Sequence, residues 1–272
     1  MVRPITVGAL DHEYMLETHQ RGINHKWHQR YFKSAELIGL ENLASIGSSQ
    51  FFGFSNHVSM WDYLEFGNRF IENLPIENFP RIIAGSNLDS RILSLLHLNF
   101  RRTGAFFVDR TKIKKLEKEE RKKYLEKVDS RAKRCLTKGD SFWDFIEGGR
   151  NRTENVLEVT KSGIVKSLIK SGINPLILTA AISYDHVPEH EFYPIIDWAK
   201  GRKGFNWLYY TADAAAFLSA PFNRKNRKNV YVNFGKPVRL HDIASGTPSQ
   251  RRSQLINYTK EEIKRLYDEI SK

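Results

Sequence analysis

The sequence predicts an α/β protein with a mixed, mostly parallel central sheet that is flanked by helices. Short apolar runs alternate along the chain with longer amphipathic stretches, glycine and proline mark the boundaries, and polar residues follow the ends of several apolar runs. Strands that alternate with helices are typical of sheets with helices packed on their faces. We expect an N-terminal helical segment over residues 1–45 and a single compact α/β domain over residues 46–272.

The first expected elements are a helix, a strand and a second helix. Residues 25–43 carry aromatic and apolar side chains at helical spacing, which predicts an amphipathic helix. The apolar run 51–54 predicts a strand. Ser59 is followed three residues later by the carboxylate of Asp62, a pattern that predicts a capping box at the start of a helix with one apolar face.

The later elements continue this alternation. Apolar runs predict strands at residues 81–84, 105–108, 141–146, 176–183 and 230–234. Helical patterns fall at residues 91–100, 114–138, 158–171 and 247–271.

Composition excludes some classes of protein. The chain has 272 residues, of which 40% are hydrophobic and 12% aromatic, so it is not a disordered protein. A single cysteine, Cys135, excludes an intramolecular disulfide and indicates a thiol in a reducing cytoplasm. No apolar run approaches the ~20 residues of a membrane-spanning helix, and residues 1–20 lack the pattern of a signal peptide. The formal charge of +12 favours an anionic partner, whether nucleic acid, anionic lipid or phosphorylated substrate.

Polar residues follow four of the predicted strands. His57, the Asp109–Arg110 pair, Glu147 and the polar run 183–185 each come just after an apolar run. The carboxyl ends of parallel strands meet at one edge of a sheet, where ligands bind. We therefore expect these side chains to lie close together.

His57 and Asp62 are candidates for acid–base chemistry. On a regular helix two residues five positions apart point about 140° away from each other. His57 must therefore lie in the loop before the helix, where the carboxylate of Asp62 in the first turn can reach back to the imidazole. Such a carboxylate fixes the tautomer and makes the other ring nitrogen a better base. The alternative is that Asp62 only caps its helix.

Basic residues near these strand ends are candidates for binding an anion. Guanidinium groups bind phosphate oxygens in a bidentate manner, and a double glycine lets the backbone approach a ligand closely. The candidates are Arg110, Gly148, Gly149, Arg150 and Arg152. Glu147 is costly to bury alone, so we expect it to pair with one of these arginines or with a substrate hydroxyl.

The motifs together resemble the glycerolipid acyltransferases. Residues 55–63 resemble their NHxSxxD block, residues 104–110 the second block, residues 145–153 the FxEGxRSRT block, and residues 177–187 the fourth. The double glycine and the run 184–187 are more similar to bacterial glycerol-3-phosphate acyltransferases than to lysophosphatidate enzymes. This chain has no proline in the fourth block and has Asn151 where serine is common.

The resemblance implies an acyltransferase-like fold and a set of roles. His57 is the general base and Asp62 its partner, and the acceptor hydroxyl attacks the thioester directly. The acceptor site consists of Arg110, Glu147, Gly148, Gly149, Arg150 and Arg152. The donor is acyl-CoA or acyl carrier protein, and no metal or other cofactor is implied. The acceptor is glycerol 3-phosphate, with dihydroxyacetone phosphate, a lysophospholipid or a nonphosphorylated alcohol as alternatives.

The expected location is the cytoplasm, peripheral on the inner face of a membrane. Residues 91–102 place apolar bulk beside cations, as interfacial helices do. Trp27, Tyr31 and Phe32 are a second candidate for membrane contact. For both segments the alternative is packing against the core.

Three other functions stay open. A nucleic-acid-binding protein accounts for the charge, but it predicts aromatic residues interleaved with Lys and Arg on one strand face, which this chain lacks. A catalytically silent scaffold is disfavoured by the presence of His57, Asp62, Glu147 and Arg150. A hydrolase uses the same base to activate water, and only product analysis separates it from a transferase.

Overall fold

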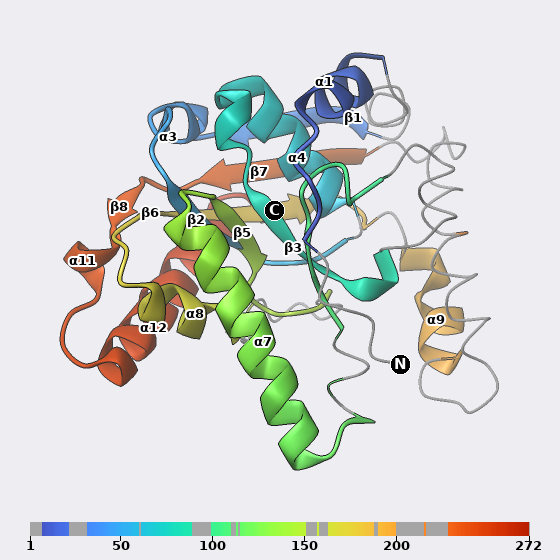
Figure 1. Cartoon of the computed structure of the whole chain (residues 1–272). Coiled ribbons are helices and arrows are strands. Elements are labelled where there is room, and N and C mark those ends of the chain that lie inside the picture. Colours follow the sequence, from blue (N-terminus) through green and yellow to red (C-terminus); the bar gives the residue numbers. More distant parts are fainter. Residues whose placement is uncertain are drawn as a thin grey trace.

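The structure is a computed structural model (Figure 1). It describes residues 7–21, 32–59, 61–88, 99–109, 113, 115–150, 157, 163–187, 190–199, 215 and 228–271. The strands are β1 (Phe32–Ile38), β2 (Phe51–Ser55), β3 (Arg81–Gly85), β4 (Phe106–Val108), β5 (Phe142–Phe145), β6 (Leu176–Tyr184), β7 (Lys228–Phe234) and β8 (Val238–Arg239). The helices are α1 (His12–Arg21), α3 (Leu40–Ala44), α4 (Asp62–Asn73), α7 (Lys118–Thr137), α8 (Gly163–Ser171), α9 (Tyr193–Ala199), α11 (Leu240–Ile243) and α12 (Pro248–Asp268). Short 3-10 turns lie at Ile76–Asn78, Ser86–Leu88 and His190–Phe192.

The strands form one mixed sheet. Its order is β1-β7-β6-β2-β5-β3-β4, with β8 paired to β6 beside this path. Strands β6, β2, β5, β3 and β4 run parallel to one another, whereas β7 and β8 run antiparallel to β6. The predicted fold class is therefore confirmed, including the mostly parallel sheet.

Helices cover both faces of the sheet (Figure 1). Helices α1, α3 and α4 pack on one face, in a core that includes Trp61, Phe66 and Trp143. Helices α7, α8, α11 and α12 pack on the other face around Phe52 and Phe142. Successive residues of β2 feed the two cores in turn, as the alternation of side chains along a strand requires.

Most predicted elements are present with shifted ends. The strands expected at 51–54, 81–84, 105–108, 141–146, 176–183 and 230–234 correspond to β2, β3, β4, β5, β6 and β7. The helices expected after Asp62 and at 114–138, 158–171 and 247–271 correspond to α4, α7, α8 and α12. The helix expected at 91–100 falls mostly on residues outside those described.

The helix predicted over residues 25–43 is wrong. Residues 32–38 form β1, an edge strand that pairs in parallel with β7, and of the described residues in this range only those from Leu40 onward are helical. Pairing with a strand almost two hundred residues away overrides the local helical pattern. Phe32 is also not a membrane-facing residue, since it is 3% exposed and lies in the core. The boundary between residues 45 and 46 stays a prediction, although β1 lies within the first of the two ranges.

Candidate active site

Four predicted site segments lie at one edge of the sheet. Strands β2, β4, β5 and β6 share one direction, so the residues that follow them emerge at the same side. His57 follows β2, Asp109 follows β4, and Glu147 follows β5. Tyr184 ends β6. The sheet thus brings to one edge groups that are far apart in the chain, such as His57 and Tyr184, which are 127 residues apart.

His57 and Asp62 are hydrogen-bonded. The imidazole Nδ1 lies 2.9 Å from Oδ2 of Asp62. The same oxygen accepts hydrogen bonds from the backbone N–H groups of Val58 (2.7 Å) and Ser59 (3.0 Å). An ionised carboxylate oxygen can only accept hydrogen bonds, so in the neutral imidazole this contact assigns the proton to Nδ1 and leaves Nε2 as the acceptor.

The predicted capping box with Ser59 at the cap is wrong. The helix begins at Asp62 with Trp61 as its N-cap, and no side chain bonds to this cap. Asp62 accepts from the backbone of Ser59, and the Ser59 hydroxyl accepts from the N–H of Trp61 at 3.1 Å. Asp62 thus bonds to the loop before the helix and to His57, and it does not act as a helix cap.

Asn56 fixes the loop to the neighbouring strand. Its side-chain amide donates to the carbonyl of Ile182 at 2.8 Å and accepts from the N–H of Ile182 at 2.8 Å. The buried side chain thereby continues the β2–β6 ladder for one more residue after β2 has ended. This pairing fixes the position of the backbone just before His57.

The imidazole has one covered face. It stacks on the ring of Phe145 at 4.4 Å between centroids, with an interplanar angle of 24°. The side chain of His57 is 20% exposed, whereas that of Asp62 is fully buried. A substrate can thus reach His57 but not its carboxylate partner.

Glu147 joins two loops. Its Oε2 accepts from the backbone N–H of His57 at 2.7 Å, and its Oε1 accepts from the backbone N–H of Leu157 at 2.9 Å. The residue is 6% exposed. These contacts give Glu147 a positioning role that sequence reasoning missed. Its expected pairing with an arginine or a substrate hydroxyl stays a prediction.

The turn after β5 needs its first glycine. Gly148 has a φ of 67°, a left-handed conformation that side chains other than glycine adopt at a cost. Its N–H donates to the carbonyl of Phe145 at 2.8 Å, which closes the turn. Gly149 faces open space, since a Cβ there meets nothing within 4 Å. Arg150 is half-buried directly after this turn, while Arg110, Asn151 and Arg152 lie outside the described residues.

Two further residues, both on α7, have structural roles. The hydroxyl of Tyr124 on α7 accepts from the N–H of Asp109 at 3.0 Å, and this bond fixes the end of β4. Cys135 is buried on the same helix, and burial raises the pKa of its thiol. The thiol is therefore kept in its unreactive protonated form.

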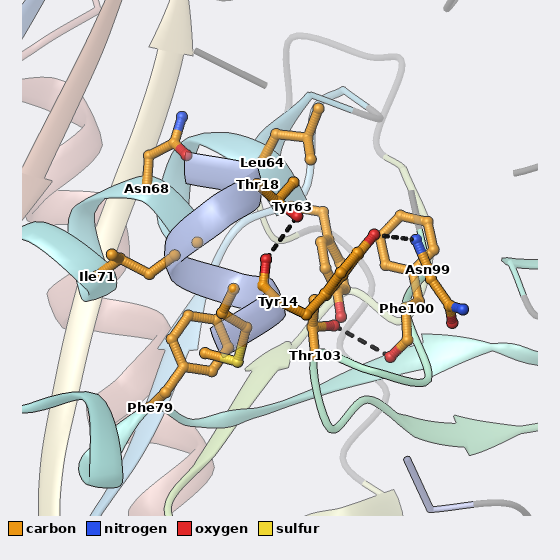
Figure 2. A pocket seen from close by; sticks show the side chains of 12 residues that line it. Tyr14, Thr18, Tyr63, Leu64, Asn68, Ile71, Phe79, Asn99, Phe100 and Thr103 are labelled. Atoms are coloured by element: carbon orange, nitrogen blue, oxygen red, sulfur yellow. Dashed lines mark hydrogen bonds between the residues drawn. The ribbon is translucent and has the colours of Figure 1, made fainter. Parts of the chain in front are cut away.

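A small pocket lies between α1 and α4 (Figure 2). It has a volume of about 40 Å³, and its lining includes Tyr63, which follows Asp62 in the chain, together with Leu64 and Ile71. The hydroxyl of Tyr14 accepts from the N–H of Asn99 at 2.9 Å, which connects α1 to the segment before β4. The apolar lining suits a hydrocarbon group better than a phosphate.

Sequence reasoning did not predict the contacts of three polar residues of this site. Ser59 and Tyr184 are hydrogen-bonded to Asp62, and Asn56 is hydrogen-bonded to the backbone of Ile182 on β6. Asn56 and Ser59 lie inside the NHxSxxD pattern, which was the available signal for them. Nothing in the sequence indicates where the hydroxyl of Tyr184 points.

Neither a cluster of metal ligands nor a membrane-spanning helix occurs among the described residues. Within them, no three His, Cys, Asp or Glu side chains are grouped so as to hold a metal ion. None of the helices in the described part of the chain is long and apolar enough to span a membrane.

The fold and part of the sequence match known proteins. The structure is similar to the crystal structure of the 1-acyl-sn-glycerophosphate (LPA) acyltransferase PlsC from Thermotoga maritima, with a TM-score of 0.52 and 16% sequence identity. The match covers 96% of this chain and 80% of that one, and at this identity it supports the fold alone. The family model described as Acyltransferase matches residues 35–183, which include β2, α4 and the candidate site. More than half of the chain matches this model, and the chain belongs to the acyltransferase family.

Proposed function

We propose that the protein transfers a fatty acyl chain from a thioester to a hydroxyl of glycerol 3-phosphate. The observation that supports this most is the 2.9 Å contact between His57 Nδ1 and Asp62 Oδ2, at the edge of the sheet where the loops after parallel strands meet. This contact leaves Nε2 of a partly exposed imidazole as a base.

The reaction needs a single base. Nε2 of His57 takes the proton of the acceptor hydroxyl as its oxygen attacks the thioester carbonyl. The new C–O bond forms and the C–S bond breaks, and the proton returns from His57 to the departing thiolate. Asp62 remains the acceptor of the Nδ1–H bond and stabilises the imidazolium that forms.

The acceptor is proposed to be a phosphorylated glycerol. Arg150 follows the glycine turn at the same sheet edge as His57, and Arg110 and Arg152 are its proposed partners on the phosphate. Glycerol 3-phosphate and 1-acyl-glycerophosphate, the substrate named for the similar structure, both carry a phosphate and a free hydroxyl. Gly148 and Gly149 are proposed to let the acceptor approach the backbone.

The first experiment measures acyl transfer with a labelled acyl-CoA. The purified chain is given glycerol 3-phosphate, 1-acyl-glycerophosphate or no acceptor, and the products are separated. We expect an acylated glycerol phosphate with the first acceptor. A product from 1-acyl-glycerophosphate alone changes the proposed acceptor, and free fatty acid alone identifies a hydrolase. Acyl carrier protein replaces CoA as donor if neither acceptor reacts.

Replacing Glu147 by glutamine should lower activity while leaving the acceptor concentration dependence largely intact. A glutamine amide turns one N–H donor towards the backbone N–H of either His57 or Leu157, so one of the two bonds is lost. We expect kcat to fall by roughly 100-fold, because displacing a reacting group by about 1 Å costs that much. Steady-state kinetics of Glu147→Gln measure this effect.

The matched control is Glu72→Gln on α4. Glu72 is more exposed and pairs with Arg69 at 2.6 Å, and such surface pairs contribute little. We expect wild-type kinetics from it. Equal activity of the two variants would show that Glu147 does not position His57.

We also propose that the protein works at a membrane surface, peripherally and from the cytoplasmic side. The proposed product is a lipid, and the net charge of +12 favours an anionic bilayer. Flotation with vesicles of anionic lipid at low salt tests this. Protein that stays at the bottom of the gradient with anionic vesicles contradicts the proposal.

A further inference from the structure

We propose that Tyr184 is a positioning residue that holds Asp62, and through it His57, in the geometry needed for base catalysis. This inference rests on the proposed acyl transfer for its kinetic consequence, but the hydrogen bonds that carry it can be tested without turnover.

The hydroxyl of Tyr184 donates to Oδ1 of Asp62 at 2.6 Å. The other oxygen of Asp62 faces His57 and two backbone N–H groups. Both oxygens of a fully buried carboxylate are thus satisfied, one by the loop and one by Tyr184. Hydrogen bonds from neutral donors to a charged acceptor are among the stronger ones in proteins.

The bond from Tyr184 fixes the plane of the carboxylate. Rotation about the Cβ–Cγ bond displaces both oxygens, so the bond to Oδ1 opposes it together with the bonds to Oδ2. Without the tyrosine hydroxyl, Oδ1 is left buried without this donor, which is costly. The Asp62 carboxylate can relieve this cost by rotating, so that each of its oxygens accepts some of the remaining hydrogen bonds. Such a rotation moves Oδ2 away from Nδ1 of His57.

Tyr184 is itself held from two sides. It lies in the antiparallel ladder of β6 and β7, opposite Val230. Its ring stacks on Phe32 of β1 at 5.7 Å, and Phe32 packs edge-on against Trp61 at 6.0 Å. The position of its hydroxyl is therefore determined by three strands and by the residue that precedes Asp62.

The chain contains a matched control for this tyrosine. The hydroxyl of Tyr231 on β7 donates to Oδ1 of Asp185 at 2.9 Å. Tyr231 is buried, Tyr184 is partly buried, and Asp185 is the exposed residue next to Tyr184. Tyr231→Phe thus removes the same chemical group, with the same kind of acceptor, from a bond that does not involve Asp62 or His57.

The kinetic test compares Tyr184→Phe with Tyr231→Phe. We expect Tyr184→Phe to lower kcat roughly 10- to 100-fold, the range of one hydrogen bond to a charged group. KM for both substrates and the Tm should change little. When Asp62 is already replaced by asparagine, adding Tyr184→Phe should change kcat by less than about twofold. The bond between His57 and the Asp62 carboxylate, which Tyr184 is proposed to position, is then already lost.

The second measurement is the NMR resonance of the Nδ1 proton of His57. It should be shifted downfield in the wild type, lost in Asp62→Asn, displaced in Tyr184→Phe and unchanged in Tyr231→Phe. Wild-type kcat together with an unmoved resonance in Tyr184→Phe would overturn the inference and leave acyl transfer intact. Equal losses of kcat and Tm in both tyrosine variants would also overturn it. A moved resonance in a protein without any transferase activity would support the positioning role and contradict the proposed function.

Discussion

Replacing His57 by alanine is expected to lower acyl transfer roughly 10³-fold or more, with little change in thermal stability. General base catalysis contributes about 10²–10⁴-fold to a rate, and Asp62 offers no substitute because its side chain is fully buried. The imidazole belongs to neither hydrophobic core, so its removal should change the Tm much less than the rate. The measurement is the initial rate of transfer from labelled acyl-CoA together with the Tm.

His241→Ala is the control for this variant. His241 is exposed on α11, which follows β8, and β8 pairs with the amino-terminal end of β6. It therefore lies at the edge of the sheet opposite to the site. We expect wild-type turnover from it. A His57→Ala protein that is folded and retains most of its activity would show that another group is the base.

Gly53→Ala is expected to destabilise the protein by about 2–3 kcal/mol, which is the upper part of the range for an overpacked core. We also expect it to reduce activity. Gly53 lies in β2 at the centre of the sheet, and a Cβ there falls 1.9 Å from Cε3 of Trp143. Trp143 is fully buried and cannot swing into open space. Its indole N–H also donates to the hydroxyl of Ser55 at 3.1 Å, so displacement of the ring reaches the residue two positions before His57.

Gly67→Ala is expected to stabilise the protein instead. Gly67 lies inside α4, and a Cβ there meets nothing within 4 Å. Alanine in a helix interior is more stable than glycine by about 0.8–1.0 kcal/mol. Urea unfolding curves of both variants measure the two effects. A Gly53→Ala protein as stable as Gly67→Ala would mean that Trp143 adjusts without cost.

The local part of the site could be predicted from the sequence. His57 and Asp62 are five residues apart, so the geometry of a loop and one helical turn determines whether they meet, and they do. The edge of the sheet could be predicted for a similar reason, because polar residues after apolar runs are visible along the chain. The direction of the strands then places them together.

The long-range part could not be predicted in this way. The contact of Tyr184 with Asp62 joins residues 122 apart, and that of Asn56 with Ile182 joins residues 126 apart. Both depend on which strands are neighbours, which no local pattern specifies. The strand β1 was missed because its residues suit a helix locally, while pairing with β7 decides the outcome.

The pairing of β1 with β7 also affects when the chain can finish folding during its synthesis. Ser34 on β1 bonds to Asn229 on β7, 195 residues later in the chain. During synthesis on the ribosome, β1 has no partner strand until β7 (Lys228–Phe234) has emerged, and Phe32 cannot yet be held against Tyr184 by that pairing. An edge strand that waits in this way is exposed to other chains and to chaperones. A long-range pairing that forms late is thus one that supports the tyrosine beside Asp62, so a nascent chain should become active only after β7 has been made.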